Sequence, residues 1–223
     1  RYWDVVREVL DILSDRLGCT FIAMSATQPS LFEKSVSLVD DSSDQAESSA
    51  NNQYFADLDR VSFQFDQSID GCSITHSDLA EQVLSHAASN PADDLLVVCN
   101  TIESATALFE NIRSQGVDNE TSLIYLSSAV RPKDRRQRIE HLRSSNQERC
   151  IVISTQVVEA GVDISMDRVW RDFAPLDSIV QAAGRCNREW DADSQGVVTV
   201  ISLMADGEAP ANAIYDAPRL DAT

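Results

Sequence analysis

Short apolar stretches with the length of β-strands alternate with helix-like stretches through most of the sequence after residue 54. The runs at 95–99 (LLVVC) and 150–153 (CIVI) are apolar throughout, as expected of strands that are buried on both faces. Further strands are predicted at 61–65, 122–126 and 197–203. This alternation is typical of a mostly parallel sheet with helices on both faces, joined by right-handed crossovers. The sequence therefore predicts an α/β fold.

The helices predicted between these strands are marked by capping residues and by apolar spacing. One begins at Asp78 with the spacing of a capping box, and the next is capped by Thr101 and ends near Gly116. A third covers 133–143, and a fourth begins with Asp177 as its N-cap.

Small polar residues follow three of the predicted strands directly. They are Asn100 and Thr101, then Ser127 and Ser128, then Ser154, Thr155 and Gln156. In open parallel sheets, ligands bind beyond the carboxyl ends of the strands. We therefore expect these residues to meet at one edge of the sheet and to form a ligand site there.

The composition is strongly acidic, with 36 Asp and Glu against 18 Lys and Arg and a net charge of −18. Lys34 and Lys133 are the only lysines in the sequence. Such a surface stays hydrated in concentrated salt, where charges are screened within ~3 Å at 1 M. We interpret it as adaptation to a high-salt cytosol, with an ordinary acidic protein as the alternative. The charge also restricts any DNA contact to a local basic surface.

The five cysteines, at 19, 72, 99, 150 and 186, contain no closely spaced pair. Such spacing favours free thiols in a reducing cytoplasm and predicts neither a disulfide nor a metal site. Cys19, Cys99 and Cys150 lie in apolar stretches, where buried thiols are common. No run of apolar residues is long enough to span a membrane, so no membrane partner is expected.

Two clusters of basic residues stand out against this acidic background. Gln181, Arg185 and Arg188 have the spacing of one face of a helix, and guanidinium groups bind phosphate with two parallel hydrogen bonds. The segment 131–143 (RPKDRRQRIEHLR) carries six Arg or Lys against two acids. Its helix predicts a contact with a phosphate backbone, although a solvated helix face paired with nearby acids is the alternative.

Short motifs in these segments resemble those of superfamily 2 helicases. STQVVEAGVDI (154–164) resembles motif V, QAAGRCNR (181–188) resembles motif VI, and SATQP (25–29) resembles motif III. LDSIVQAAGRCNR (176–188) is similar to the version in the CRISPR-associated helicase-nuclease of type I systems, which destroys DNA marked by a guide-RNA surveillance complex. The resemblance implies a RecA-like three-layer fold and an ATP-dependent helicase that moves along single-stranded DNA.

The resemblance also divides the chain. It implies the last helix and strand of a first RecA-like domain in 1–34, an acidic flexible linker in 35–53, a second RecA-like domain in 54–205 and a further C-terminal region or tail in 206–223. Within the first part, apolar spacing predicts a helix over 3–17, a stop at Gly18 and a strand over 19–24.

On the nucleotide side, the resemblance assigns roles to five residues. Arg185 and Arg188 match the arginine fingers that neutralise charge on the transferring phosphoryl group. Gln181 matches the amide that positions the γ-phosphate or the attacking water. Gly161 and Asp163 match the part of motif V that senses the nucleotide, Asp163 by a hydrogen bond near the ribose or a finger.

On the nucleic-acid side, Thr155 and Arg135 match contacts with the phosphates of the bound strand, and Thr101 is assigned with them. Ser25 and Thr27 match the motif that couples the ATP state to domain closure. The implied partners are single-stranded DNA, the surveillance complex with its guide RNA, a first RecA-like domain and a nuclease domain.

ATP hydrolysis also needs a phosphate-cradling loop with a lysine and a carboxylate pair that holds Mg²⁺. None of the seven glycines precedes a lysine, and no Asp-Glu dipeptide occurs. We therefore expect a first domain upstream of Arg1 to hold most of the ATP and Mg²⁺, and this chain alone to be inactive. The alternatives are another superfamily 2 helicase acting on RNA or DNA, and a catalytically dead remnant that binds nucleic acid or docks.

Overall fold

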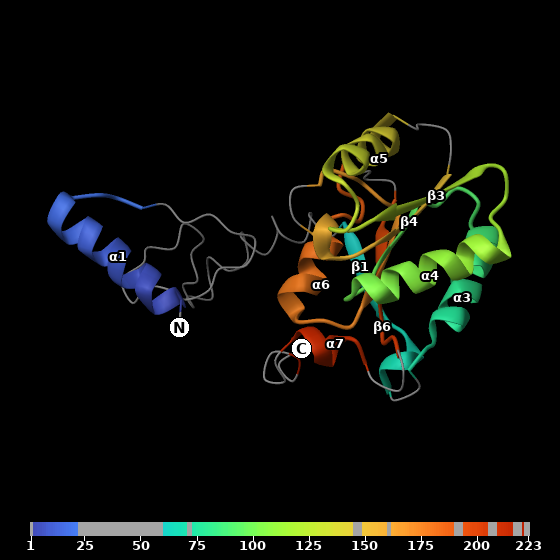
Figure 1. The fold of residues 1–223 in the computed structure, drawn as a ribbon, viewed down its shortest axis with the longest axis horizontal. Coiled ribbons are helices and arrows are strands. Elements are labelled where there is room, and N and C mark those ends of the chain that lie inside the picture. Colours follow the sequence, from blue (N-terminus) through green and yellow to red (C-terminus); the bar gives the residue numbers. More distant parts are fainter. Residues whose placement is uncertain are drawn as a thin grey trace, which may run out of the picture. The chain divides into compact units, whose positions relative to one another are not determined.

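The computed structural model describes residues 2–21, 60–70, 73–144, 149–159, 162–189, 194–204, 209–215 and 220. The chain forms two compact units, 1–57 and 58–223, which are considered separately below (Figure 1). The second unit contains all of the described strands.

The sheet of the second unit is parallel throughout its described strands. In spatial order they are β1 (Val61–Phe65), β6 (Gly196–Ile201), β5 (Arg168–Asp172), β2 (Leu95–Val98), β4 (Arg149–Ser154) and β3 (Thr121–Leu126). The five strands predicted after residue 54 are confirmed, and the α/β prediction with them. β5 was missed because its sequence, RVWRD, places two arginines in a five-residue strand.

Helices cover both faces of this sheet and complete a three-layer fold. α3 (His76–Ser89) and α4 (Ile102–Gln115) lie side by side in Figure 1. α5 (Pro132–Ser144) and α6 (Leu176–Ala183) cover the opposite face, and the short elements are η1 (Gln67–Asp70), η2 (Gln156–Val158) and α7 (Ala211–Ile214).

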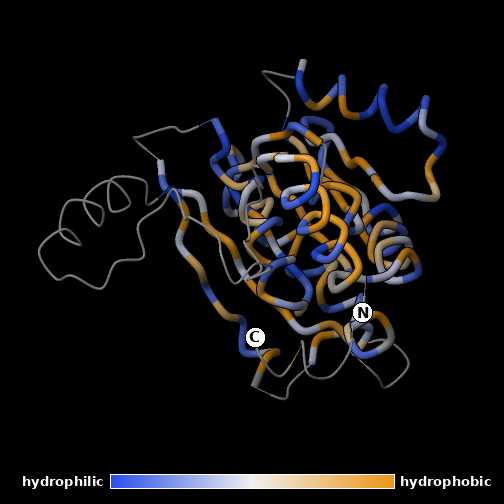
Figure 2. The backbone as a smooth tube through the Cα atoms, turned by 90° about the vertical axis from the view of Figure 1, so that its left-hand side faces the viewer, coloured by the Kyte–Doolittle hydropathy of each residue, from blue (hydrophilic) through white to orange (hydrophobic). Residues whose placement is uncertain are grey.

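Successive side chains of β2 point into two different cores, as the pleat of a strand requires. Leu95 and Val97 pack with α3 and α4, whereas Leu96 and Val98 pack with η2, α5 and α6. All four residues are buried. Figure 2 shows the hydrophobic segments gathered in the interior of this unit. The central strand is therefore apolar along its whole length because both of its faces are covered.

The ends of α3 and α4 show how local sequence fixes helix boundaries. Thr75, not Asp78, caps α3, because its hydroxyl oxygen accepts a 3.2 Å hydrogen bond from the Asp78 amide. The prediction of a start at Asp78 was therefore wrong by about a turn. The Thr101 cap of α4 is confirmed by a 2.9 Å bond from the Ser104 amide, and Gly116 ends that helix with a φ of 88°.

The prediction that Gln181, Arg185 and Arg188 share one helix face was wrong. α6 ends at Ala183, and the chain then turns so that Asn187 adopts a left-handed φ of 44°. The helix also begins earlier than expected, with Pro175 in the N-cap position, so Asp177 is not the N-cap. The two arginines therefore lie on a loop after the helix.

The first unit contains α1 (Tyr2–Leu17), which confirms the helix predicted there. Gly18 ends it with a φ of 63°, while its amide and that of Cys19 bond to the carbonyls of Ser14 and Leu13. Residues 19–21 form no strand, and Cys19 is exposed, contrary to the prediction of a buried thiol. The rest of the predicted strand, Ser25, Thr27 and the 35–53 linker lie outside the described residues.

Candidate functional site

The polar residues predicted to meet at the carboxyl edge of the sheet do so. Asn100, Ser127, Ser154 and Thr155 follow or end neighbouring strands, and all four are buried. The Ser154 hydroxyl donates to the Leu126 carbonyl at 2.9 Å, and the Thr155 amide donates to the same carbonyl at 3.2 Å. This edge is thus fixed by hydrogen bonds between strands.

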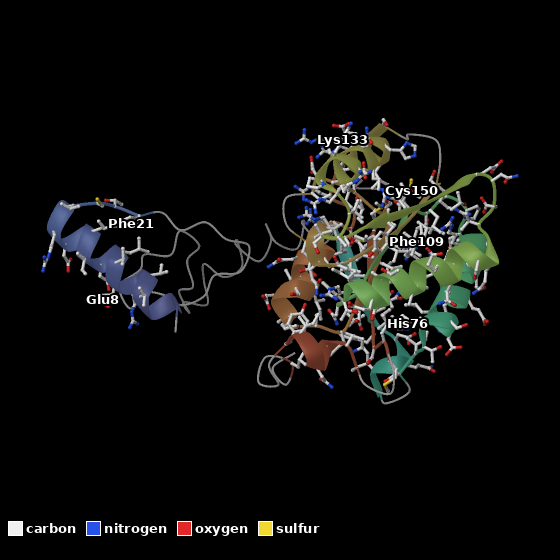
Figure 3. The ribbon with its side chains drawn as sticks, in the orientation of Figure 1. Glu8, Phe21, His76, Phe109, Lys133 and Cys150 are labelled. Atoms are coloured by element: carbon white, nitrogen blue, oxygen red, sulfur yellow. The ribbon has the colours of Figure 1, made fainter. Side chains whose placement is uncertain are left out.

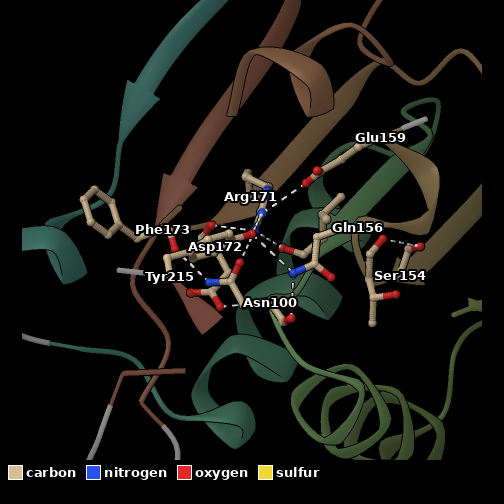
Figure 4. Close-up of polar contacts among 10 residues, drawn as sticks. Asn100, Ser154, Gln156, Glu159, Arg171, Asp172, Phe173 and Tyr215 are labelled. Atoms are coloured by element: carbon tan, nitrogen blue, oxygen red, sulfur yellow. Dashed lines mark hydrogen bonds and ion pairs between the residues drawn. The ribbon is translucent and has the colours of Figure 1, made fainter. Parts of the chain in front are cut away.

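A buried arginine that sequence reasoning missed lies at the centre of this edge (Figure 4). Arg171, near the end of β5, has no exposed side-chain surface and forms an ion pair with Glu159 at 3.0 Å. It also donates to the Asn100 side-chain oxygen at 2.8 Å and to the Asp172 carbonyl at 2.7 Å. The sequence signal that could have revealed this buried arginine is its position next to an aspartate in a stretch with the length of a strand.

Two carboxyl groups flank this guanidinium, and burial raises the pKa of both. Burial raises the pKa of Asp172 to about 6, against the opposing effects of a hydrogen bond from the Leu203 amide and the charge of Arg171. Burial also raises the pKa of Glu159, and Arg171 again opposes the shift. The guanidinium therefore helps to keep two buried acids ionised.

The loop that carries the two predicted finger arginines is fastened to residues 158–167. The Met166 amide donates to the Arg185 carbonyl at 2.9 Å, and the Asn187 amide donates to the Met166 carbonyl at 2.8 Å. The Ser165 hydroxyl oxygen accepts from the Arg188 amide at 2.9 Å. The loop after α6 and residues 165–166 therefore form one hydrogen-bonded unit.

Arg185 is buried in this unit, with 8% of its surface exposed. Its guanidinium donates from Nε to the Val158 carbonyl and from Nη2 to the Glu159 carbonyl, each at 2.7 Å. Contact with a nucleotide phosphate would require release of these bonds. In the present arrangement Arg185 fixes the main chain of the motif V segment.

Arg188 is in a different environment, with 39% of its side chain exposed. Its Nε lies 2.8 Å from Asp163, so the structure brings two of the predicted nucleotide-binding residues together. Arg143, from the basic helix α5, also reaches Asp163, with its Nε donating to the main-chain carbonyl at 2.9 Å. Asp163 thus connects the loop after α6 with α5.

Among the described residues, no hydrogen bond or ion pair joins the other predicted site residues to Asp163 or to the Arg188 side chain. The Thr101 hydroxyl is committed to Ser104, to which it donates at 2.9 Å, and Thr155 is 4% exposed. Gln181 and Arg135 are both partly exposed, whereas Gly161 lies outside the described residues. On α5, Lys133 is exposed and lies at the outer side of the unit (Figure 3).

Within the part of the chain that the structure describes, no group of three or more His, Cys, Asp and Glu is placed to hold a metal ion. No described helix has the length and apolar character needed to cross a bilayer. The described cysteines form no disulfide with one another, and burial raises the pKa of Cys186 to about 12.

A parallel α/β sheet with helices on both faces, and polar residues at its carboxyl edge, gives the second unit a RecA-like three-layer fold. The solved structure titled "Crystal structure of T. fusca Cas3-AMPPNP" has this fold, with a TM-score of 0.59 at 16% identity, over 72% of this chain and 20% of that one. More narrowly, residues 92–191 match the family described as CRISPR-associated nuclease/helicase Cas3, C-terminal. Over these residues the chain is thus similar to the C-terminal helicase portion of Cas3 proteins.

Two curated relatives carry the same name, CRISPR-associated nuclease/helicase Cas3. The protein of Haloferax volcanii is 29% identical in a match that covers 92% of this chain and 30% of the relative. The protein of Methanothermobacter thermautotrophicus is 32% identical over 136 residues, which span 60% of this chain and 16% of the relative. The chain therefore spans less than a third of the length of either relative.

Proposed function

We propose that this chain is the second motor domain, with the end of the first, of an ATP-dependent helicase that moves along single-stranded DNA in type I CRISPR interference. The observation that carries the proposal is the placement of Arg188. Its guanidinium is partly exposed and is held by Asp163 at 2.8 Å, on a loop whose main chain is bonded to Ser165, just before β5. A cation placed in this way can reach a phosphate supplied by another domain.

On the nucleotide side, Arg188 acts as the arginine finger, Gln181 positions the γ-phosphate or water, and Gly161 and Asp163 sense the nucleotide. Arg185 joins as a second finger once the carbonyls of Val158 and Glu159 release it. The donor set fits a phosphate, because it consists of guanidinium and amide groups. ATP supplies the phosphoryl group, and the first RecA-like domain holds most of it together with Mg²⁺.

On the strand side, the exposed basic surface of α5 contacts the phosphate backbone through Arg135. Thr155 and Thr101 contact the strand at the carboxyl edge, Thr101 by exchanging its bond with Ser104. Ser25 and Thr27 couple the ATP state to closure of the two domains. The surveillance complex and its guide RNA deliver the DNA, and the acidic composition suits a high-salt cytosol.

The decisive experiment is the substitution Arg188→Ala in the complete protein. DNA-stimulated ATP turnover should fall by about 10³-fold or more, because removal of an arginine finger leaves transition-state charge unneutralised. Single-stranded DNA binding should change little. Arg113→Ala is the matched control, since Arg113 is exposed and pairs only with Glu110 among the described residues.

Turnover that survives in Arg188→Ala would remove the finger assignment. Loss of turnover together with an equal loss of DNA binding would indicate a general packing defect instead. The amide contacts of the loop use Ser165 and main-chain groups, so the variant retains the means to keep its backbone in place.

A further inference from the structure

The start of the motif V segment is held from its buried side by polar groups of three other chain segments (Figure 4). The side-chain amide of Gln156 donates to the main-chain carbonyl of Asn100 at 2.7 Å. The Glu159 carboxylate pairs with Arg171 at 3.0 Å. These contacts fix both ends of the short η2 helix. They join chain segments that are 56 residues apart in one case and 12 in the other, so no local sequence signal predicts them.

A tyrosine from the C-terminal segment closes this arrangement. The Tyr215 hydroxyl oxygen accepts from the side-chain amide of Gln156 and from the Arg171 guanidinium, each at 3.3 Å. A phenol oxygen can accept two such bonds, so one hydroxyl bridges the motif V segment and the buried guanidinium.

The position of that hydroxyl is set by packing of the C-terminal segment. The Tyr215 ring packs against a small core made by Ala174, Ile179 and Val200, and its amide donates to the Ala211 carbonyl at 2.9 Å. Ile179 belongs to α6, which leads directly into the loop that carries Arg188. The same tyrosine therefore contacts elements on both sides of the candidate site.

The segment held in this way carries both proposed functions. Thr155 stands at its start and Asp163 follows its end, while the carbonyls of Val158 and Glu159 bind Arg185. Arg171 is completely buried, and Glu159 is 7% exposed in its side chain, so their pair is largely removed from water. A buried pair of this kind is costly to break and fixes geometry closely.

We propose that Arg171 and Tyr215 are positioning residues that hold the 155–159 segment in the geometry that binds strand and nucleotide. The C-terminal segment 209–215 is accordingly a working part of the motor domain. This inference rests on the proposed helicase function, because it assigns the segment a role in that activity.

The test is the substitution Tyr215→Phe in the complete protein, which removes the hydroxyl and keeps the ring in its core. Loss of the two hydrogen bonds should lower DNA-stimulated ATP turnover roughly three- to tenfold. It should also raise the KM for ATP and the DNA concentration that gives half-maximal stimulation. Tyr125→Phe is the matched control, because the Tyr125 hydroxyl contacts the Thr106 hydroxyl at an exposed site on another part of the fold.

A second readout does not depend on activity. Amide hydrogen exchange in 155–159 should be faster in Tyr215→Phe than in the wild type or in Tyr125→Phe, while exchange in β2 stays unchanged. If Tyr215 contributed only to stability, turnover would fall in proportion to the fraction of folded protein. The KM for ATP and the DNA concentration for half-maximal stimulation would then stay unchanged. Unchanged exchange and unchanged half-saturation would overturn the inference.

The outcomes separate this inference from the function on which it rests. If Arg188→Ala is inactive and Tyr215→Phe behaves like the wild type, only the positioning role fails. If Arg188→Ala retains turnover, the finger assignment fails, and the exchange measurement still decides whether Tyr215 holds the segment. Arg171→Lys keeps a positive charge but loses the forked donor geometry, and it should show the same changes in larger degree.

Discussion

At the scale of single residues, two arginines three positions apart have opposite environments. Arg185 is buried and donates to two main-chain carbonyls, whereas Arg188 is partly exposed and pairs with Asp163. The difference arises from the turn at Asn187, whose positive φ of 44° redirects the chain between them. Asparagine tolerates this conformation better than most residues. The backbone after α6 therefore decides which guanidinium can reach a ligand.

Close packing around this turn predicts the effect of Gly196→Ala. A Cβ atom at this position would lie 2.5 Å from the Cys186 sulfur and 3.1 Å from the Asn187 Cβ. Overpacking of this kind should lower the free energy of unfolding by roughly 1–3 kcal/mol, measured by urea denaturation of the chain. Adding Cys186→Ala removes the sulfur and should recover part of that loss. Equal stability of Gly196→Ala and the wild type would contradict the close approach.

At the scale of elements, α5 differs from α3, α4 and α6 in having no buried residue. It touches the core only through the partly buried side chains of Ile139 and Leu142. Its remaining surface is basic in a chain of net charge −18. Such a helix contributes little to the core, and under the proposed function its charge serves to contact a phosphate backbone.

The substitution Arg135→Ala tests this surface in the complete protein. Affinity for single-stranded DNA should fall several-fold, and the dependence of binding on salt should become shallower, since one phosphate contact is lost. Arg131→Ala is the control, because Arg131 forms an ion pair with Asp134 at 2.8 Å. Binding that is lost equally in both variants would point to the general charge of the helix and not to Arg135.

At the scale of the whole molecule, the charge balance sets the conditions under which the chain is stable. A net charge of −18 over 223 residues produces repulsion within the folded state. The described ion pairs, such as Arg168 with Asp93, neutralise only part of it. Salt screens such repulsion, since the Debye length falls from about 10 Å at 0.1 M to about 3 Å at 1 M.

The free energy of unfolding should therefore rise as KCl increases from about 0.2 M to about 2 M. Urea denaturation at several salt concentrations measures this. A variant with Glu103→Gln, Glu120→Gln and Glu140→Gln, all at exposed positions, should show a weaker rise because it carries less charge. A stability that is flat or falls with salt would contradict the high-salt interpretation.

The layered α/β fold, most of its strands and helices, and the meeting of polar residues at the carboxyl edge can all be predicted from the amino-acid sequence alone. These follow from apolar periodicity and from the rule that parallel strands end at one edge, both of which are local properties. Three features are visible only in the folded molecule: α6 ends at Ala183, Arg171 is buried, and the Tyr215 hydroxyl contacts Gln156. Contacts between distant segments set these features, and spacing along the chain carries no information about which distant groups will meet.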